Sequence, residues 1–143
     1  MRRIKTRYWT LDTRLWTLDK KVIMTKEYSY ENLDVWKQGC DAAIRVYGLT
    51  KSFPREEVFG LTSQIRRAAV SIPSNIAEGF GRGTDKEKIQ FYIIARGSVA
   101  EVKTQLFLAK ELKYVEDEQY KIMADELTII HKMLNKMISY LKD

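Results

Sequence analysis

Residues 60–83 read GLTSQIRRAAVSIPSNIAEGFGRG, a run of helix-forming residues that ends among three glycines. Successive residues of an α-helix are rotated by about 100° around its axis, so the side chains fall on three faces. The first face is apolar and comprises Leu61, Ile65, Ala68, Ile72 and Ile76. The second, beside it, is polar and comprises Gln64, Arg67, Ser71, Asn75 and Glu78. The third, roughly opposite the first, holds Phe59, Val70, Pro73 and Ala77.

A helix that is apolar or small on two sides is normally covered on two sides. We therefore expect the first face to pack inside the domain and the third to meet a neighbouring copy of the chain. The polar second face has a counterpart in Ser98 and Glu101 on the next helix, and we expect a hydrogen-bonded network between the two helices. Arg67 would pair with Glu101 or Glu78, because buried charges need partners. The alternative is that this polar face lines a subunit contact or a ligand-contacting surface.

The same segment carries a family resemblance. Residues 61–79 resemble the signature of the 23S rRNA intervening-sequence protein family, which are small bacterial four-helix-bundle proteins. Three flanking pieces agree with it in order and approximate spacing: LDVW at 33–36, FPRE at 53–56 and IARGSVAE at 94–101. The resemblance covers roughly residues 30–143.

This resemblance implies a four-helix bundle that forms a ring-like homo-oligomer, with a pentamer as the expected form. A more distant resemblance links the chain to the accessory variability determinant of diversity-generating retroelements, a pentameric bundle that partners a reverse transcriptase and RNA. Together these resemblances imply an accessory protein that binds RNA or a nucleic-acid enzyme. A protein-interaction scaffold with no nucleic-acid role is the competing hypothesis.

Composition places the chain in one class. Its 143 residues suit one domain with a sizeable core, and the few prolines and glycines favour an all-α fold. No apolar run is long enough to span a membrane, and the N-terminus lacks the apolar segment of a secretory signal. The single cysteine, Cys40, excludes an internal disulfide and suits a reducing cytoplasm, so we expect a cytoplasmic protein with no membrane partner.

The positive charge is concentrated at the N-terminus. Residues 1–23 hold seven Lys and Arg against two Asp, which is +5 of the net +6 and leaves +1 for the remainder. They also contain a duplication, TRYWTLD at 6–12 followed by TRLWTLD at 13–19. We expect 1–27 to be an irregular basic extension and 28–143 to be the bundle domain. Our hypothesis is that translation begins at Met24; the alternative is a basic, aromatic arm that contacts RNA.

Periodicity predicts four helices, at about 31–51, 54–80, 85–112 and 117–141, joined by short connections that favour an antiparallel up-down-up-down bundle. Pro73 lies inside the second helix, where it removes a backbone hydrogen bond, so we expect a kink. Gly97 in the third helix suggests close approach of another helix, since glycine disfavours helix by about 0.8–1 kcal/mol. Glycines 79, 81 and 83 are expected in left-handed conformations at the helix end. The buried stripe predicted for the first helix comprises Leu33, Trp36, Cys40, Ala43 and Tyr47.

Few residues suit catalysis. With one histidine, His131, and one cysteine, the chain offers no nucleophile dyad and no zinc site, and it lacks the Glu-x-x-His motifs of di-metal bundles. We expect no enzyme activity, no metal and no cofactor. The candidate nucleic-acid contacts form a basic group around the turn between the second and third helices, although a solvated surface explains the same residues: Arg66, Arg82, Lys86, Lys88 and Arg96.

Overall fold

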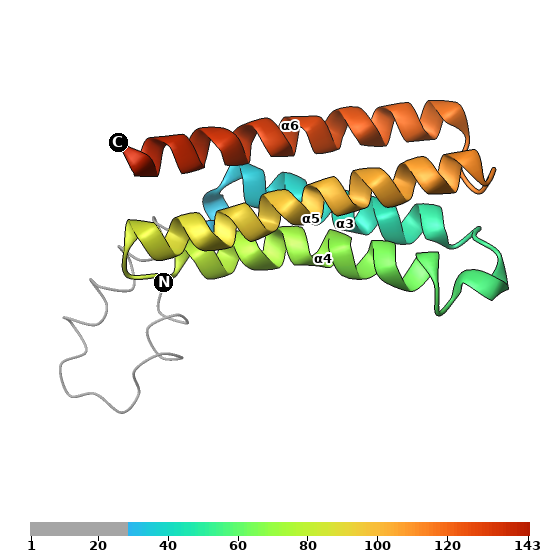
Figure 1. Ribbon diagram of the computed structural model, residues 1–143, viewed down its shortest axis with the longest axis horizontal. Coiled ribbons are helices and arrows are strands. Elements are labelled where there is room, and N and C mark those ends of the chain that lie inside the picture. The colour runs from blue at the N-terminus through green and yellow to red at the C-terminus, as the bar shows by residue number, and fades with distance from the viewer. Residues whose placement is uncertain (1–28) are drawn as a thin grey trace, which may run out of the picture.

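The computed structural model describes residues 29–143, all of whose regular structure is helical (Figure 1). The N-terminal extension, its duplication and the expected start at Met24 lie outside the described residues. The four long helices expected from the sequence are present, with one short 3-10 turn before the first and another between the first and the second. The elements are η1 (Tyr30–Asn32), α3 (Asp34–Thr50), η2 (Arg55–Glu57), α4 (Leu61–Phe80), α5 (Asp85–Glu111) and α6 (Asp117–Lys142).

Local chemistry explains where α5 and α6 begin. The Thr84 hydroxyl accepts a hydrogen bond from the backbone N–H of Glu87, and the side chain of Glu116 forms a capping box with Gln119. Both arrangements satisfy N–H groups that have no partner inside the helix.

The second predicted helix is shorter than expected. The segment that follows Pro54 forms η2 and a turn, and α4 begins only at Leu61. The backbone of Gly60 explains the break, because its φ of −110° and ψ of −118° are far from helical values. From Leu61 the helix continues through Pro73 to Phe80, and the kink at Pro73 stays a prediction.

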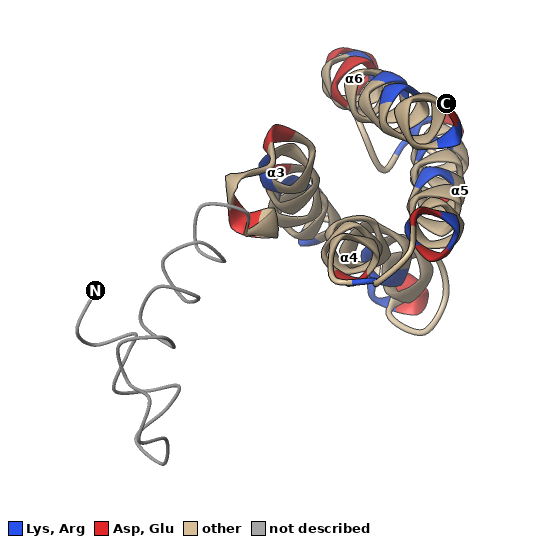
Figure 2. Ribbon diagram, turned by 90° about the vertical axis from the view of Figure 1, so that its left-hand side faces the viewer, with Lys and Arg blue, Asp and Glu red and all other residues tan. Residues whose placement is uncertain are grey.

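The helices form a four-helix bundle that is closed less tightly between α3 and α6 than between helices adjacent in the chain. α4 lies between α3 and α5, and α6 packs on the other side of α5, whereas α3 and α6 touch far less. Figure 2 shows this arrangement end-on, with Lys and Arg interspersed among Asp and Glu. Contacts between α4 and α5, and between α5 and α6, run in opposite order along the two partners, which makes these two pairs antiparallel. The contacts are Arg67–Glu101 then Ser71–Ser98, and Arg96–Asn135 then Lys103–Thr128.

The core confirms the first face of α4 and corrects the predicted stripe of α3. Ile65, Ile72 and Ile76 are almost fully buried. On α3, Tyr47 is 42% exposed and Cys40 only half-buried. The cause is Gly39, where an added Cβ would lie 3.3 Å from Ile72 and 3.5 Å from Pro73. This close approach turns a different face of α3 inward, namely Val35, Gly39, Ala42, Ala43, Val46 and Thr50.

Two expectations about glycines were wrong. No glycine among the described residues has a positive φ, so the end of α4 uses no left-handed glycine. A Cβ added at Gly97 would meet nothing within 4 Å, so no neighbouring helix of the protomer approaches there. The close approach lies one residue later, at buried Ser98. None of the described helices combines the length and apolar character needed to cross a bilayer.

Candidate functional site

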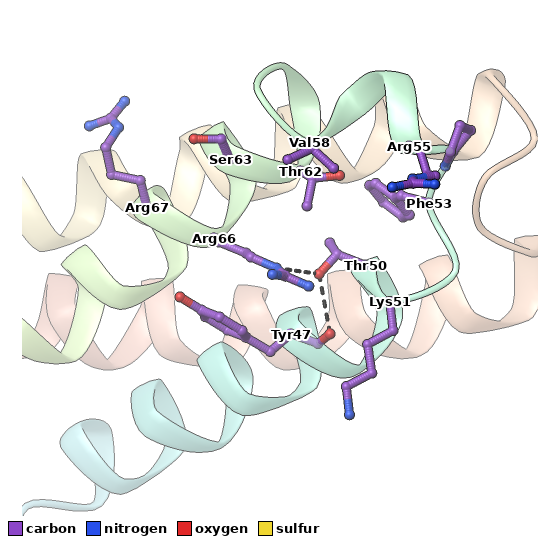
Figure 3. A pocket seen from close by; sticks show the side chains of 11 residues that line it. Tyr47, Thr50, Lys51, Phe53, Arg55, Val58, Thr62, Ser63, Arg66 and Arg67 are labelled. Carbon is purple, nitrogen blue, oxygen red and sulfur yellow. Dashed lines mark hydrogen bonds between the residues drawn. The ribbon is translucent and has the colours of Figure 1, made fainter.

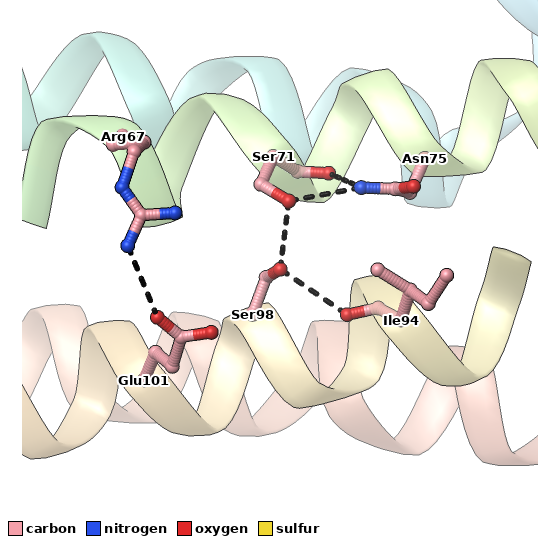
Figure 4. Close-up of polar contacts among 6 residues, drawn as sticks. All are labelled: Arg67, Ser71, Asn75, Ile94, Ser98 and Glu101. Atoms are coloured by element: carbon pink, nitrogen blue, oxygen red, sulfur yellow. Dashed lines mark hydrogen bonds and ion pairs between the residues drawn. The ribbon is translucent and has the colours of Figure 1, made fainter.

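The predicted polar network is present in part, where α4 faces α5 (Figure 4). The Asn75 amide donates to the Ser71 hydroxyl at 2.9 Å and to the Ser71 carbonyl at 2.8 Å. The Ser71 and Ser98 hydroxyl oxygens are 2.8 Å apart, and the Ser98 hydroxyl donates to the Ile94 carbonyl at 3.1 Å. A hydroxyl has one proton, so Ser71 donates to Ser98. We call Ser71, Asn75 and Ser98 the α4–α5 polar seam.

The other expected members lie at its margin or elsewhere. Arg67 reaches Glu101 at only 4.0 Å, and both side chains are more than half exposed. Glu78 pairs with Arg82 instead, and Gln64 is exposed to solvent. Because hydrogen bonds within the seam already occupy its hydroxyl protons, it serves the packing of α4 on α5 better than it would serve a ligand.

The predicted oligomer face needs one correction. Phe59 is 97% exposed, Val70 is 43% exposed and Ala77 is partly exposed. Pro73, however, is buried against Gly39 of α3, so it cannot contact another copy. Val58 joins the exposed group at 49%. Val58 and Phe59 lie in the turn that precedes α4, whereas Val70 and Ala77 lie on the helix itself; we call these four residues together the outer α4 face.

The five candidate nucleic-acid contacts do not form one patch. Arg66 lies 16 residues before Arg82, about 24 Å away along the α4 axis and its continuation. Arg82 pairs with Glu78 and lies over the Phe91 ring, and Arg96 donates to Asn135 at 2.9 Å. Lys86 is exposed, and Lys88 is half-buried beside an apolar groove. These five side chains therefore lie at two ends of α4 and on α5.

Arg66 belongs instead to a different cationic site at the connection between α3 and α4. An open cavity of about 550 Å³ lies there, which we call the α3–α4 cavity (Figure 3). Four cationic and four hydroxyl side chains contribute to its lining, and no Asp or Glu does. They are Lys51, Arg55, Arg66 and Arg67, with Tyr47, Thr50, Thr62 and Ser63.

Sequence reasoning missed this cavity because its residues come from three segments: the end of α3, the connection and the first turns of α4. The connection contributes Lys51 and Arg55 and α4 contributes Arg66 and Arg67, so no segment holds more than two of the four cations. The one indication in the sequence was that Lys51 and Arg55 lie on either side of Pro54 and that Arg66 and Arg67 follow within the next helix.

The residues with nucleophilic or metal-binding chemistry do not form a reactive site. Burial, and secondarily the carboxylate of Asp41, raises the pKa of the Cys40 thiol, which disfavours the reactive thiolate. His131 lies on α6, half-buried. Within residues 29–143 no group of three His, Cys, Asp or Glu side chains is arranged to hold a metal ion.

Comparisons with known proteins agree on one family. A family model described as 23S rRNA-intervening sequence protein matches residues 31–136. One similar solved structure is a protein of unknown function from the S23 ribosomal protein family from Bacteroides thetaiotaomicron VPI-5482. It is 28% identical and superposes with a TM-score of 0.68, covering 73% of this chain and 97% of its own. A comparison with curated proteins finds no match.

Proposed function

Because this chain belongs to the 23S rRNA-intervening sequence protein family, we propose that it is a non-catalytic accessory protein of the cytoplasm that assembles with itself and binds RNA. The single observation that carries RNA binding is the cationic lining of the α3–α4 cavity. Four of the residues that line it are Lys or Arg, and none is Asp or Glu.

For RNA binding, the local grouping of unpaired cations matters more than the net charge of the bundle. Residues 24–143 carry only about +1 in total, so a diffuse attraction to polyanions is weak. Cations elsewhere on the described bundle are partly neutralised, as Arg45 is by Glu126 at 2.7 Å and Arg82 by Glu78. Lys51, Arg55 and Arg66 have no such ion pair among the described residues, so they are available for phosphates.

The test compares two charge-matched double variants of the full chain. Lys51→Gln with Arg66→Gln removes two cations from the α3–α4 cavity, whereas Lys121→Gln with Lys132→Gln removes two exposed cations from α6. Binding of a labelled single-stranded RNA is followed by fluorescence anisotropy from about 50 to 200 mM salt. We expect the cavity variant to reduce the slope of log K against log salt by about 1.4, since each phosphate contact contributes about 0.7, and the α6 variant to leave the slope unchanged.

Equal effects of the two variants would contradict the proposed interface. Absence of RNA binding by the unaltered chain at the lowest salt would leave the protein-interaction scaffold as the better hypothesis. The N-terminal extension is identical in all three proteins, so its seven cations cancel from the comparison.

A further inference from the structure

We propose that the α3–α4 cavity is a specific binding site for one phosphate group, which Arg66 and the first turn of α4 hold together. This inference deepens the proposed function and rests on it for the source of the phosphate, while the geometry of the site stands independently. The phosphate belongs either to RNA or to a free phosphorylated compound, which share the same chemistry.

Arg66 is held in place before any ligand arrives. Its Nε donates to the Thr50 hydroxyl at 2.8 Å, and its guanidinium carbon lies 4.6 Å from the centre of the Tyr47 ring. Thr50 is only 3% exposed, and its hydroxyl donates back to its own helix, to the Val46 carbonyl at 2.8 Å and the Tyr47 carbonyl at 3.2 Å. The Thr50 oxygen therefore remains an acceptor for Arg66 (Figure 3).

This arrangement leaves the outer edge of the guanidinium free. No hydrogen bond or ion pair of the described residues uses the Arg66 Nη groups. Two adjacent N–H groups of a planar guanidinium match two oxygens of a phosphate. Because Thr50 and Tyr47 already restrict the side chain, less conformational entropy is lost on binding than for a free arginine.

The first turn of α4 supplies the second half of the site. Gly60 provides no side-chain cap; the Leu61 N–H reaches the Glu57 carboxylate at 3.4 Å, and no acceptor serves the N–H groups of Thr62 and Ser63 among the described residues. Free N–H groups and the positive end of the helix dipole favour a phosphate at such a position.

Thr62 gives an independent sign that a partner is missing. The residue is 8% exposed and lines the cavity, yet its Oγ1 has no hydrogen-bond partner. An unsatisfied buried hydroxyl costs about 1–3 kcal/mol. The Thr62 Oγ1 is itself buried in its present rotamer, so a phosphate could use it only after rotation about the Cα–Cβ bond.

The lining also indicates that the site does not recognise the base of a nucleotide. Arg66 covers one face of the Tyr47 ring, although the residue is 42% exposed, and Phe53 is only 8% exposed, so the aromatic face turned towards Arg66 is closed to a stacking base. Lys51 and Arg55 add positive charge. The site therefore recognises phosphate without preference for the attached base.

The experiment uses Thr50→Val, which removes the acceptor that holds Arg66 while leaving every cation in place. Thr128→Val is the matched control, because Thr128 accepts from Lys103 at 2.9 Å and donates to the Ala124 carbonyl at 2.8 Å in the same manner on α6. Inorganic phosphate is titrated into each full-length protein at constant ionic strength, with binding followed by calorimetry. We expect saturable binding that weakens about tenfold in Thr50→Val, is unchanged in Thr128→Val, and is restored in Thr50→Ser.

A second arm identifies the source of the phosphate. One RNA oligonucleotide is compared with and without a 5′-phosphate. Tighter binding of the phosphorylated form, lost in Thr50→Val, supports the site and assigns it to RNA ends. Phosphate binding that responds to Thr50→Val, with no RNA binding, supports the site and contradicts the proposed function. RNA binding together with no saturable phosphate binding, or with equal phosphate affinity in Thr50→Val and Thr128→Val, overturns the site and leaves the proposed function standing.

Discussion

Gly79, near the end of α4, lies against two residues of α5 that leave no room for a side chain. A Cβ built there would lie 2.8 Å from the Tyr92 ring and 2.9 Å from the Cβ of Phe91. Tyr92 is 3% exposed, and the Phe91 Cβ is attached directly to the α5 backbone, so neither neighbour moves without shifting a helix. The absence of a side chain at Gly79 allows α4 and α5 to meet closely beside their connecting turn.

The first prediction is that Gly79→Ala destabilises the protein by about 1–2 kcal/mol. Overpacking a close contact costs about 1–3 kcal/mol, which outweighs the gain of up to about 1 kcal/mol when alanine replaces glycine in a helix. The control is Gly48→Ala on α3, where a Cβ meets nothing within 4 Å, and this change should stabilise. Urea unfolding followed by circular dichroism measures both. Equal effects of the two substitutions would contradict the role given to Gly79.

At the scale of elements, the α4–α5 polar seam links the two helices by a directed chain of hydrogen bonds from Asn75 through Ser71 to Ser98. Ser98 is 4% exposed, and its hydroxyl both accepts from Ser71 and donates to the Ile94 carbonyl. Small side chains at these positions permit close packing, and their hydroxyls satisfy one another inside it.

The second prediction concerns this coupling. Ser98→Ala should cost about 1–2 kcal/mol, because the Ser71 hydroxyl loses its acceptor in a partly buried setting. Adding Ser71→Ala should then cost less than it does alone, since the two residues act as one unit. A double-mutant cycle by urea unfolding measures the coupling, with Thr104→Ala as a control in which an exposed hydroxyl bonds only its own helix. Strictly additive effects would refute the coupling.

The helices also show which features of the fold can be predicted from the sequence. Threonine followed three residues later by glutamate located the start of α5, and the 3.6-residue period identified the buried face of α4, because both signals act within one helix. The register of α3 was missed since Gly39 carries no apolar side chain to count, although it makes the tightest approach to α4. The same contact removed Pro73 from the outer face.

The α3–α4 cavity could not be predicted from the sequence for a related reason. Its polarity depends on Thr50 of α3 meeting Arg66 of α4 at 2.8 Å, a contact between helices that no periodicity within one helix specifies. The basic residues were instead grouped by their nearness along the chain at the α4–α5 turn. There Arg82 has a partner of its own in Glu78.

At the scale of the whole molecule, the outer α4 face presents apolar side chains to solvent. Phe59 is 97% exposed beside Val58, and Val70 and Ala77 continue the outer α4 face. α4 also packs between α3 and α5. A second copy that packs on α4 would therefore lie next to those two helices as well. Single exposed apolar residues are ordinary, but an aromatic side chain within such a group is typical of an interface anchor.

The last prediction follows from that face. Light scattering coupled to size exclusion should give a mass that is a multiple of the protomer mass, five-fold according to the family resemblance, and Phe59→Asp should reduce it to the protomer mass. Loss of a central aromatic anchor typically costs 2 kcal/mol or more at each interface, and a ring multiplies that loss over every contact. The control is Tyr140→Asp, since Tyr140 is likewise highly exposed, at 81%, but belongs to α6 and not to the outer α4 face. Both variants should keep the helical circular dichroism of the parent. A protomer-sized parent, or an assembly that tolerates Phe59→Asp as well as Tyr140→Asp, would show that the outer α4 face is not the surface through which copies meet.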